Sequence, residues 1–273
     1  MARRPPALSP SRANDFQQCP LLFRLRTIDQ VAEPPSAAAT LGTLVHSILE
    51  KVFDLPPRER TLEAASDMIR PTWDAMCEKT PALRELHETS SDREAWLGEA
   101  RQRLETYFSL ENPQRLEPDS REQFLQWDLP DGPTLRGIVD RVDVAQDGSI
   151  RIVDYKTGKA PSAQYGHQAK FQMRFYALLV ARLRGRIPSV LQLLYLRDGG
   201  TVSLNPTSED LDLAEHQIRE VWSDILNSAR SSEWPTKRSR LCAWCSFQAL
   251  CPEFGGTPPP LDPAAVDKAL GTL

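Results

Sequence analysis

The sequence lacks any apolar run long enough to cross a lipid bilayer. Its longest runs, such as Phe175–Ala181, fall far short of the roughly 20 apolar residues that a membrane-spanning helix needs. The first ten residues, MARRPPALSP, contain two arginines but no apolar segment behind them, which argues against a secretory signal. We therefore expect a cytoplasmic protein that does not associate with membranes.

A net positive charge is also absent. The 33 Lys and Arg residues are outnumbered by 37 Asp and Glu, which gives a net charge of −4. Any binding of nucleic acid must therefore depend on where the charges lie. The basic segments 182–186 and 237–240 are typical of solvated surface. No G-x-x-x-x-G-K-[ST] motif occurs, so a helicase motor, if one is needed, would be a partner chain.

The C-terminal segment lacks a fourth cysteine. Cys242, Cys245 and Cys251 lie within ten residues of one another, whereas a tetrahedral metal site or an iron–sulfur cluster normally takes four ligands. In a cytoplasmic protein, cysteines favour metal binding or inert burial over disulfides. The distant Cys19 and Cys77 complete the five, and Cys77 lies in an apolar-periodic segment typical of a buried small hydrophobe.

The secondary-structure pattern changes along the chain. The first eight residues predict a loose arm, and Ser9, Pro10 and Pro20 predict a short helix that ends at Cys19. Helical periodicity then continues from near Gly42 and over residues 61–79 and 91–110. From about residue 121 we expect three strands, a helix over 162–183, two more strands, a helix over 208–228 and a Pro-rich tail.

Residues 137–159, GIVDRVDVAQDGSIRIVDYKTGK, predict a β-hairpin. A two-residue turn at Asp147-Gly148 would place charged residues opposite apolar ones. A three-residue loop of 146–148, with Gly148 in the left-handed conformation, pairs apolar residues with apolar residues and a negative charge with a positive one. This register pairs Val144 with Ile150, Val142 with Ile152 and Asp143 with Arg151.

The same register places Asp140 opposite Asp154, with Lys156 one pleat further on the same face. Two carboxylates at this separation repel each other unless a cation lies between them. Oxygen ligands of this kind suit Mg²⁺ or Mn²⁺. The alternative is a solvated hairpin, which the apolar residues on the same face disfavour.

The hairpin resembles the PD-(D/E)XK nuclease superfamily, and its wording GIVDRVD…IVDYKTGK is similar to RecB-family exonuclease domains. The resemblance implies an α/β, restriction-endonuclease-like fold with a central mixed β-sheet flanked by helices. It assigns residues 1–118 to a helical N-terminal region, 119–230 to the nuclease core and 231–273 to a C-terminal cysteine clasp with a Pro-rich tail, in one compact domain.

The resemblance also implies roles for individual residues. His46, in GTLVHSILE, and the backbone carbonyl of Tyr155 would join Asp140 and Asp154 in holding the metal. Without the resemblance, a lone helical histidine would be read as core or surface. Glu122 is either a further acidic ligand or an exposed strand residue. The residues implied to be catalytic are Asp140, Asp154 and Lys156, and those implied to contact DNA are Gln172 and Tyr176 of the Q-x-x-x-Y motif.

A subgroup of RecB-like nucleases, including the AddB and CRISPR-adaptation types, carries a four-cysteine iron–sulfur cluster with one ligand before the nuclease core and three after it. The sequence resembles this arrangement, which implies a [4Fe–4S] cluster on Cys19, Cys242, Cys245 and Cys251. Zinc is the competing occupant, because thiolate spacing alone does not exclude it.

Together these patterns predict a metal-dependent DNA nuclease. The expected activity is that of an exonuclease on single-stranded ends, in DNA repair or recombination. The alternative is a non-catalytic DNA-binding or assembly module that retains the fold and a structural metal cluster.

Overall fold

The computed structural model describes residues 6–161 and 166–271. Its N-terminal half contains helices and one very short strand, as the sequence predicts for most of this region. The elements are β1 (Ala7–Leu8), α1 (Pro10–Gln18), α2 (Pro20–Phe23), the π-helix η1 (Arg24–Ile28), α3 (Ala37–Val52), α4 (Leu62–Asp67), α5 (Ile69–Lys79) and α6 (Ser90–Leu110).

The second half supplies most of the sheet and two long helices that pack together. Its elements are β2 (Ser120–Asp128), β3 (Thr134–Val144), β4 (Ile150–Lys156), α7 (His167–Arg184), β5 (Val190–Tyr195), β6 (Gly200–Leu204), α8 (Ser208–Ser231) and α9 (Pro263–Leu270). None of the helices in the described part of the chain is long and apolar enough to span a bilayer.

Local signals explain several helix boundaries. The Ser9 side chain accepts a hydrogen bond from the backbone N–H of Arg12, and α1 ends at Cys19 as predicted. The start of α3 near Gly42 was predicted wrongly, because Ser36 caps the helix at Ala37. The segment 61–79 forms two helices that meet at Met68. The start of the predicted helix at 162–183 lies outside the described residues.

The sheet is mixed and six-stranded, in the order β1-β3-β4-β5-β6, with β2 paired along β3. β1 and β5 run parallel to their neighbours β3 and β4, and the remaining pairs are antiparallel. The first eight residues are therefore not a loose arm throughout, since Ala7 and Leu8 are buried in β1.

One edge of β3 is divided between two partners. β1 pairs with its start at Thr134 and Leu135, and β4 pairs with its end from Arg141 to Val144. Among the described residues, no strand pairs with this edge at positions 136–140. The sheet is therefore split where Asp140 lies, and this split provides space for functional side chains.

The β3–β4 hairpin has the predicted three-residue loop, with Gly148 at φ +79°. Asp143 lies opposite Arg151, and Val142 lies opposite Ile152. The expectation that all four apolar residues of this face enter the core was wrong for Val144, which is 39% exposed because the hairpin tip extends beyond the packed helices.

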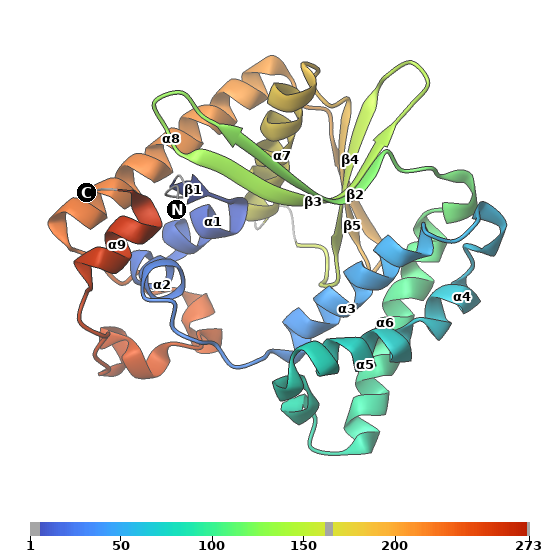
Figure 1. Ribbon diagram of the computed structural model, residues 1–273, viewed down its shortest axis with the longest axis horizontal. Helices are drawn as coiled ribbons and strands as arrows, with labels where there is room; N and C mark the ends of the chain where they lie inside the picture. The colour runs from blue at the N-terminus through green and yellow to red at the C-terminus, as the bar shows by residue number, and fades with distance from the viewer. Residues whose placement is uncertain (1–5, 162–165, 272–273) are drawn as a thin grey trace.

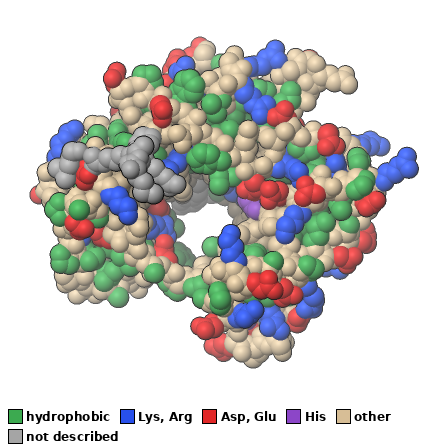
Figure 2. Space-filling view, in the orientation of Figure 1, with side chains coloured by type: hydrophobic (Ala, Val, Ile, Leu, Met, Phe, Trp, Pro, Cys, Tyr) green, Lys and Arg blue, Asp and Glu red, His purple; other side chains and the backbone are tan. Residues whose placement is uncertain are grey.

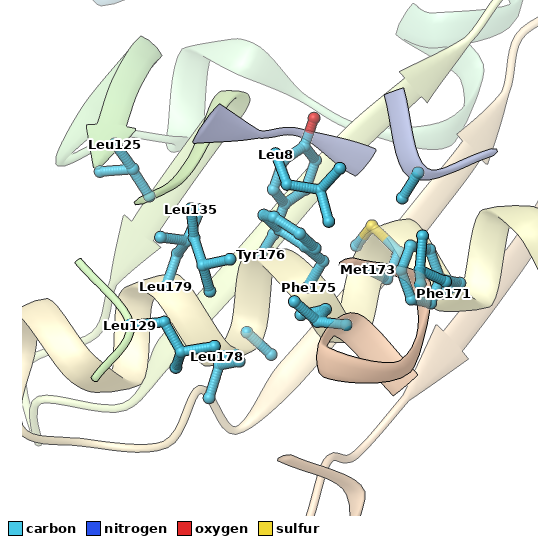
Figure 3. Packing of buried hydrophobic residues seen from close by; sticks show 14 of the residues in the cluster. Leu8, Leu125, Leu129, Leu135, Phe171, Met173, Phe175, Tyr176, Leu178 and Leu179 are labelled. Carbon is cyan, nitrogen blue, oxygen red and sulfur yellow. The ribbon is translucent and has the colours of Figure 1, made fainter. Parts of the chain in front are cut away.

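The two faces of the sheet are covered by different helices (Figure 1). Alternate residues of β4 show this division, because Ile150 and Ile152 join the core formed with α1, α7, α8 and α9, whereas Val153 and Tyr155 join the core formed with α3 to α6. Figure 3 shows part of the first core, in which Leu8 and Leu135 pack near Tyr176 and Leu179 of α7. β4 is therefore a central strand that is buried on both faces. This α/β fold is consistent with a restriction-endonuclease-like core.

Candidate metal and nuclease site

Asp140 ends the backbone ladder between β3 and β4. Its Oδ2 atom accepts a hydrogen bond of 2.7 Å from the backbone N–H of Tyr155, at the point where the strand pairing stops after Arg141 and Val153. The carboxylate thus replaces a backbone carbonyl as acceptor. This contact fixes its position relative to the Asp154-Tyr155-Lys156 segment.

His46 reaches the same place from α3. Its Nδ1 atom lies 3.5 Å from Asp140 Oδ1 and 3.8 Å from Glu122 Oε1, and its Nε2 atom lies 3.0 Å from the carbonyl oxygen of Tyr155. Burial disfavours the charged imidazole, but the Asp140 and Glu122 carboxylates outweigh burial and raise the pKa of His46 to about 10. A single proton therefore neutralises part of an acidic pocket.

Glu122 completes this group from β2. It lies between the paired residues Arg121 and Gln123, which face Arg141 and Val139, and it has a positive φ of +43°. An L-residue rarely adopts this conformation except where the surrounding structure imposes it, often at functional sites. Ligand atoms of His46, Glu122 and Asp140 all lie within 4.8 Å of one another.

Asp154 belongs to a second, adjoining group. Its side chain is 2% exposed, and its Oδ2 atom lies 2.6 Å from Lys156 Nζ. Gln172 of α7 donates 3.0 Å to Asp154 Oδ1 and accepts 2.8 Å from Lys156 Nζ. Burial and the charge of Asp140 raise the pKa of Asp154 to about 6, against the lowering effect of Lys156.

The Q-x-x-x-Y pair lies in contact with this second group. Gln172 Nε2 lies 3.1 Å from the Tyr176 hydroxyl, as their spacing of one helical turn allows. The structure thus brings the predicted residues together as two neighbouring sets. One set contains His46, Glu122, Asp140 and the Tyr155 carbonyl, and the other contains Asp154, Lys156, Gln172 and Tyr176.

The first set fits a divalent metal ion. Two carboxylates, one imidazole and a backbone carbonyl converge, and carboxylate and carbonyl oxygens are ligands that Mg²⁺ and Mn²⁺ prefer. The acidic charge there also needs a cation, since only the His46 proton opposes it within the set. Glu122 was left open by its sequence position, because neither the register of β2 on β3 nor its positive φ was predicted.

Arg141 was missed by the sequence interpretation. It is fully buried, and its Nη1 atom donates 2.8 Å to the Tyr155 hydroxyl and 3.2 Å to that of Tyr107. It also forms an ion pair of 2.8 Å with Glu111. These contacts hold Tyr155 from the face opposite Asp154, and both backbone groups of Tyr155 contact the metal set. The available signal was an arginine placed between two aspartates on a strand.

Two clefts adjoin the site. One has a volume of about 480 Å³ and is lined by His46, Lys156 and Lys159 among others. The other has a volume of about 470 Å³ and is lined by Phe124, Gln172 and Tyr176 among others. Figure 2 shows an opening through the centre of the molecule, with acidic and histidine side chains at its right-hand rim.

The four cysteines of the predicted clasp line one small pocket. Burial and the three neighbouring cysteines raise the pKa of the Cys245 thiol. Within the described chain, however, no three of their sulfurs lie within 4.8 Å of one another, so they do not form a compact ligand set like that at His46. Cys77 is buried with α3 to α6, as expected.

Comparisons with known proteins agree with this geometry. A family profile described as the PD-(D/E)XK nuclease superfamily matches residues 7–252. The Gene 69 protein of Mycobacterium phage D29 is 30% identical over 272 residues, covering 91% of this chain and 97% of the phage protein. The Gene 69 protein of Mycobacterium phage L5 is 26% identical over 289 residues, with the same coverages.

A solved structure shares the fold. The crystal structure of a "Putative exonuclease" from Eubacterium rectale superposes with a TM-score of 0.55 at 14% identity, covering 88% of this chain and 86% of that one. The family match spans nearly the whole chain and includes both residue sets of the candidate site. The chain therefore belongs to the PD-(D/E)XK nuclease superfamily.

Proposed function

We propose that this protein is a metal-dependent DNA nuclease that hydrolyses phosphodiester bonds. The observation that carries the proposal is the proximity of the two residue sets, since the charge of Asp140 acts on Asp154. A metal-ligand group of His46, Glu122 and Asp140 adjoins the buried Asp154, which lies 2.6 Å from the ammonium group of Lys156. Acidic ligands beside a held lysine suit attack on a phosphodiester, because negative charge develops on the phosphate.

His46, Glu122, Asp140 and the Tyr155 carbonyl would hold Mg²⁺ or Mn²⁺, with Asp154 as a further ligand. An ion there would polarise the scissile phosphate and lower the pKa of a bound water molecule. Asp140 is already positioned by its hydrogen bond from Tyr155 N–H.

Lys156 would orient the attacking water or stabilise charge on the phosphate oxygens. Its ammonium is held by Asp154 and by the Gln172 carbonyl oxygen, so it faces the site in a defined position. Gln172 uses both ends of its amide in this network and also contacts Tyr176. These two residues of α7 would therefore position the nucleic acid as well as the catalytic groups.

The substrate would be a single strand with a free end. The central opening in Figure 2 supports this proposal, because a strand that passes through it would run beside the acidic rim. In the same view, α3 and the segment 29–36 border the opening (Figure 1). The DYKTG wording supports a RecB-type exonuclease acting in DNA repair or recombination, with any unwinding motor on a separate chain.

The clasp would hold a [4Fe–4S] cluster on Cys19, Cys242, Cys245 and Cys251. Among the described residues, no three of their sulfurs lie within 4.8 Å of one another, whereas Zn–S bonds of about 2.3 Å would place all four within about 4 Å. A larger inorganic core suits that spacing better. Its role would be structural, joining α1 and α2 to the C-terminal segment.

The test of catalysis compares the wild type with Lys156→Ala on a labelled linear single-stranded oligonucleotide in Mg²⁺. Loss of the ammonium should lower the cleavage rate by roughly 100-fold or more, whereas Lys268→Ala, on α9 and outside the site, should cut at the wild-type rate. A covalently closed circle of the same sequence should resist cleavage if a free end is needed.

Equal cleavage by wild type and Lys156→Ala would contradict the catalytic assignment. Binding of DNA without cleavage by any form of the protein would instead favour the non-catalytic module. Cleavage of the circle at the same rate as the linear strand would leave a nuclease but would reject the requirement for an end.

A further inference from the structure

Two large apolar side chains lie exposed on the sheet beside the metal set. Phe124 of β2 is 58% exposed and Ile138 of β3 is 49% exposed. They are directly opposite each other in the antiparallel register, so they form one apolar patch. A cross-strand pair of this kind would normally be covered, because exposed adjoining apolar groups favour contact with another molecule.

The register places this patch next to the proposed metal. Phe124 is two residues beyond Glu122 on β2, and Ile138 is two residues before Asp140 on β3. Residues two apart on a strand are about 7 Å apart along it. The apolar pair therefore lies close to the acidic pair along the same two strands.

The cleft over this patch has cationic and polar walls. Its lining includes Arg12 of α1, Arg136 of β3, and Gln172 and Tyr176 of α7. Burial lowers the pKa of Arg12, and the positive charge of Arg136 lowers it further. Two guanidinium groups are thus close enough to repel each other, and a phosphate between them would relieve the repulsion.

We propose that this cleft is a nucleotide subsite, in which Phe124 stacks on the base next to the scissile phosphate and Arg12 and Arg136 bind the neighbouring phosphate. The proposal rests on the function proposed above and names the part of the strand that the site would hold. An aromatic face combined with arginines is the combination that binds single strands without sequence preference.

Gln172 and Tyr176 tie the subsite to the chemistry. Gln172 lines the cleft and contacts both Asp154 and Lys156. A base held against Phe124 would therefore lie beside the residue that positions the ammonium. Phe124 is 58% exposed and is not among the proposed metal ligands, so its loss should weaken binding of the strand without changing the metal set.

The test is a double-mutant cycle between Phe124→Ala and an abasic nucleotide. Binding of labelled linear strands is measured by fluorescence anisotropy in the Lys156→Ala background, with single abasic positions placed in turn along the strand. Base–aromatic stacking contributes about 1–3 kcal/mol, so Phe124→Ala should weaken binding by roughly 5- to 150-fold. An abasic position at the subsite should weaken strand binding by a similar factor in the protein that retains Phe124. In the protein that carries Phe124→Ala, the same abasic position should leave binding almost unchanged.

Phe124→Trp should restore the affinity and the sensitivity to the abasic position, since it retains the ring. Leu213→Ala is the matched control, because Leu213 is 45% exposed but lies on α8, outside the residues that line the cleft. One outcome overturns the subsite and leaves the nuclease proposal standing. In that outcome the wild type cleaves the strand, but every abasic position weakens binding equally with Phe124 and with Phe124→Ala. If the protein neither binds nor cleaves DNA, both proposals are overturned.

Discussion

His46 lies among groups that attract positive charge. Asp140, Glu122 and the Tyr155 carbonyl all lie within 3.8 Å of its ring nitrogens, and Asp154 adds its charge from further away. In the absence of a divalent ion, the imidazolium supplies the only cation in the His46–Glu122–Asp140 set. A proton and a metal ion are thus alternative ways of stabilising the same acidic pocket.

We therefore predict a pH-dependent stability for the protein without divalent ions. The pKa of His46 rises from 6.5 to about 10 on folding, so its contribution is complete below pH 6.5 and is lost as the pH rises through about 10. The free energy of unfolding should fall between about pH 7 and about pH 10, and the decrease should be smaller in His46→Asn. Urea unfolding at several pH values measures this difference.

His216→Asn is the control, because His216 lies exposed on α8 beside Glu220. It should follow the wild-type pH profile. Identical profiles for wild type and His46→Asn would contradict the prediction. Added Mg²⁺ should reduce the loss of stability at high pH, because the ion takes over the role of the proton.

The relative positions of the residues in the hairpin were predictable because they follow from the length of its turn and the strand register. One turn type fixes the register, and the register places Asp140 relative to Asp154. Glu122 was left open and Arg141 was missed, because their roles depend on contacts that sequence spacing does not encode. Glu122 needs the β2 register and a left-handed backbone, and Arg141 needs Glu111 and Tyr107 from the end of α6.

At the scale of elements, the divided edge of β3 is the feature that makes room for the site. On this edge, in the interval between β1 and β4, helix α7 lies against β3 where another strand would otherwise pair. Gly137 lies in this interval, and a Cβ atom built on it would be 2.7 Å from Cε1 of Tyr176. The absence of a side chain at Gly137 thus lets α7 approach the sheet.

Gly137→Ala should displace the Tyr176 ring and, through it, Gln172. We expect the cleavage rate to fall by about tenfold, because small misplacements of positioning groups are costly, and the free energy of unfolding to fall by roughly 1–3 kcal/mol from overpacking. Gly98→Ala is the control, since nothing lies within 4 Å of its added methyl group in α6. That change should raise stability by about 0.5–1 kcal/mol and leave cleavage unchanged. A normal cleavage rate for Gly137→Ala would contradict the proposed role of Tyr176.

Elements were predictable where capping and periodicity act locally. α1 and α8 begin near residues whose side chains cap them, and the strands from 120 onward follow β-rich segments separated by turn residues. β1 was missed because two residues, Ala7 and Leu8, form a strand only through pairing with β3. α9 was missed because its proline-rich approach dominates the composition, although Asp262 caps it and Pro263 occupies its first position.

At the scale of the whole molecule, helices α1 and α2 and the C-terminal segment form one lobe (Figure 1). Leu21, Leu22 and Leu25 pack with Phe247 in a small apolar cluster, which Cys19, Cys245 and Cys251 adjoin. Lys237 donates 2.9 Å to the Gln17 carbonyl. The proposed cluster would therefore reinforce a contact that packing already makes.

Cys19→Ala should abolish iron incorporation and lower the unfolding midpoint. A ligand far from the other three in sequence closes a very long loop, where the entropy of closure is largest. Anaerobic purification, iron analysis and thermal unfolding measure both effects. Cys77→Ala is the control and should keep its iron, because Cys77 lies in the other apolar core. A colourless wild-type protein that contains zinc would show that the cysteines bind zinc and not an iron–sulfur cluster.

The two ends of the described chain lie side by side (Figure 1), with Gly271 close enough to Pro6 that an added methyl group would be 3.2 Å from it. During synthesis on the ribosome, all the residues of the proposed hydrolytic centre emerge before Cys242 does. The contact between α1–α2 and the cysteine segment cannot form until Cys242, Cys245 and Cys251 have been synthesised. A nascent chain would thus acquire its acidic pocket first and its closing cysteines afterwards.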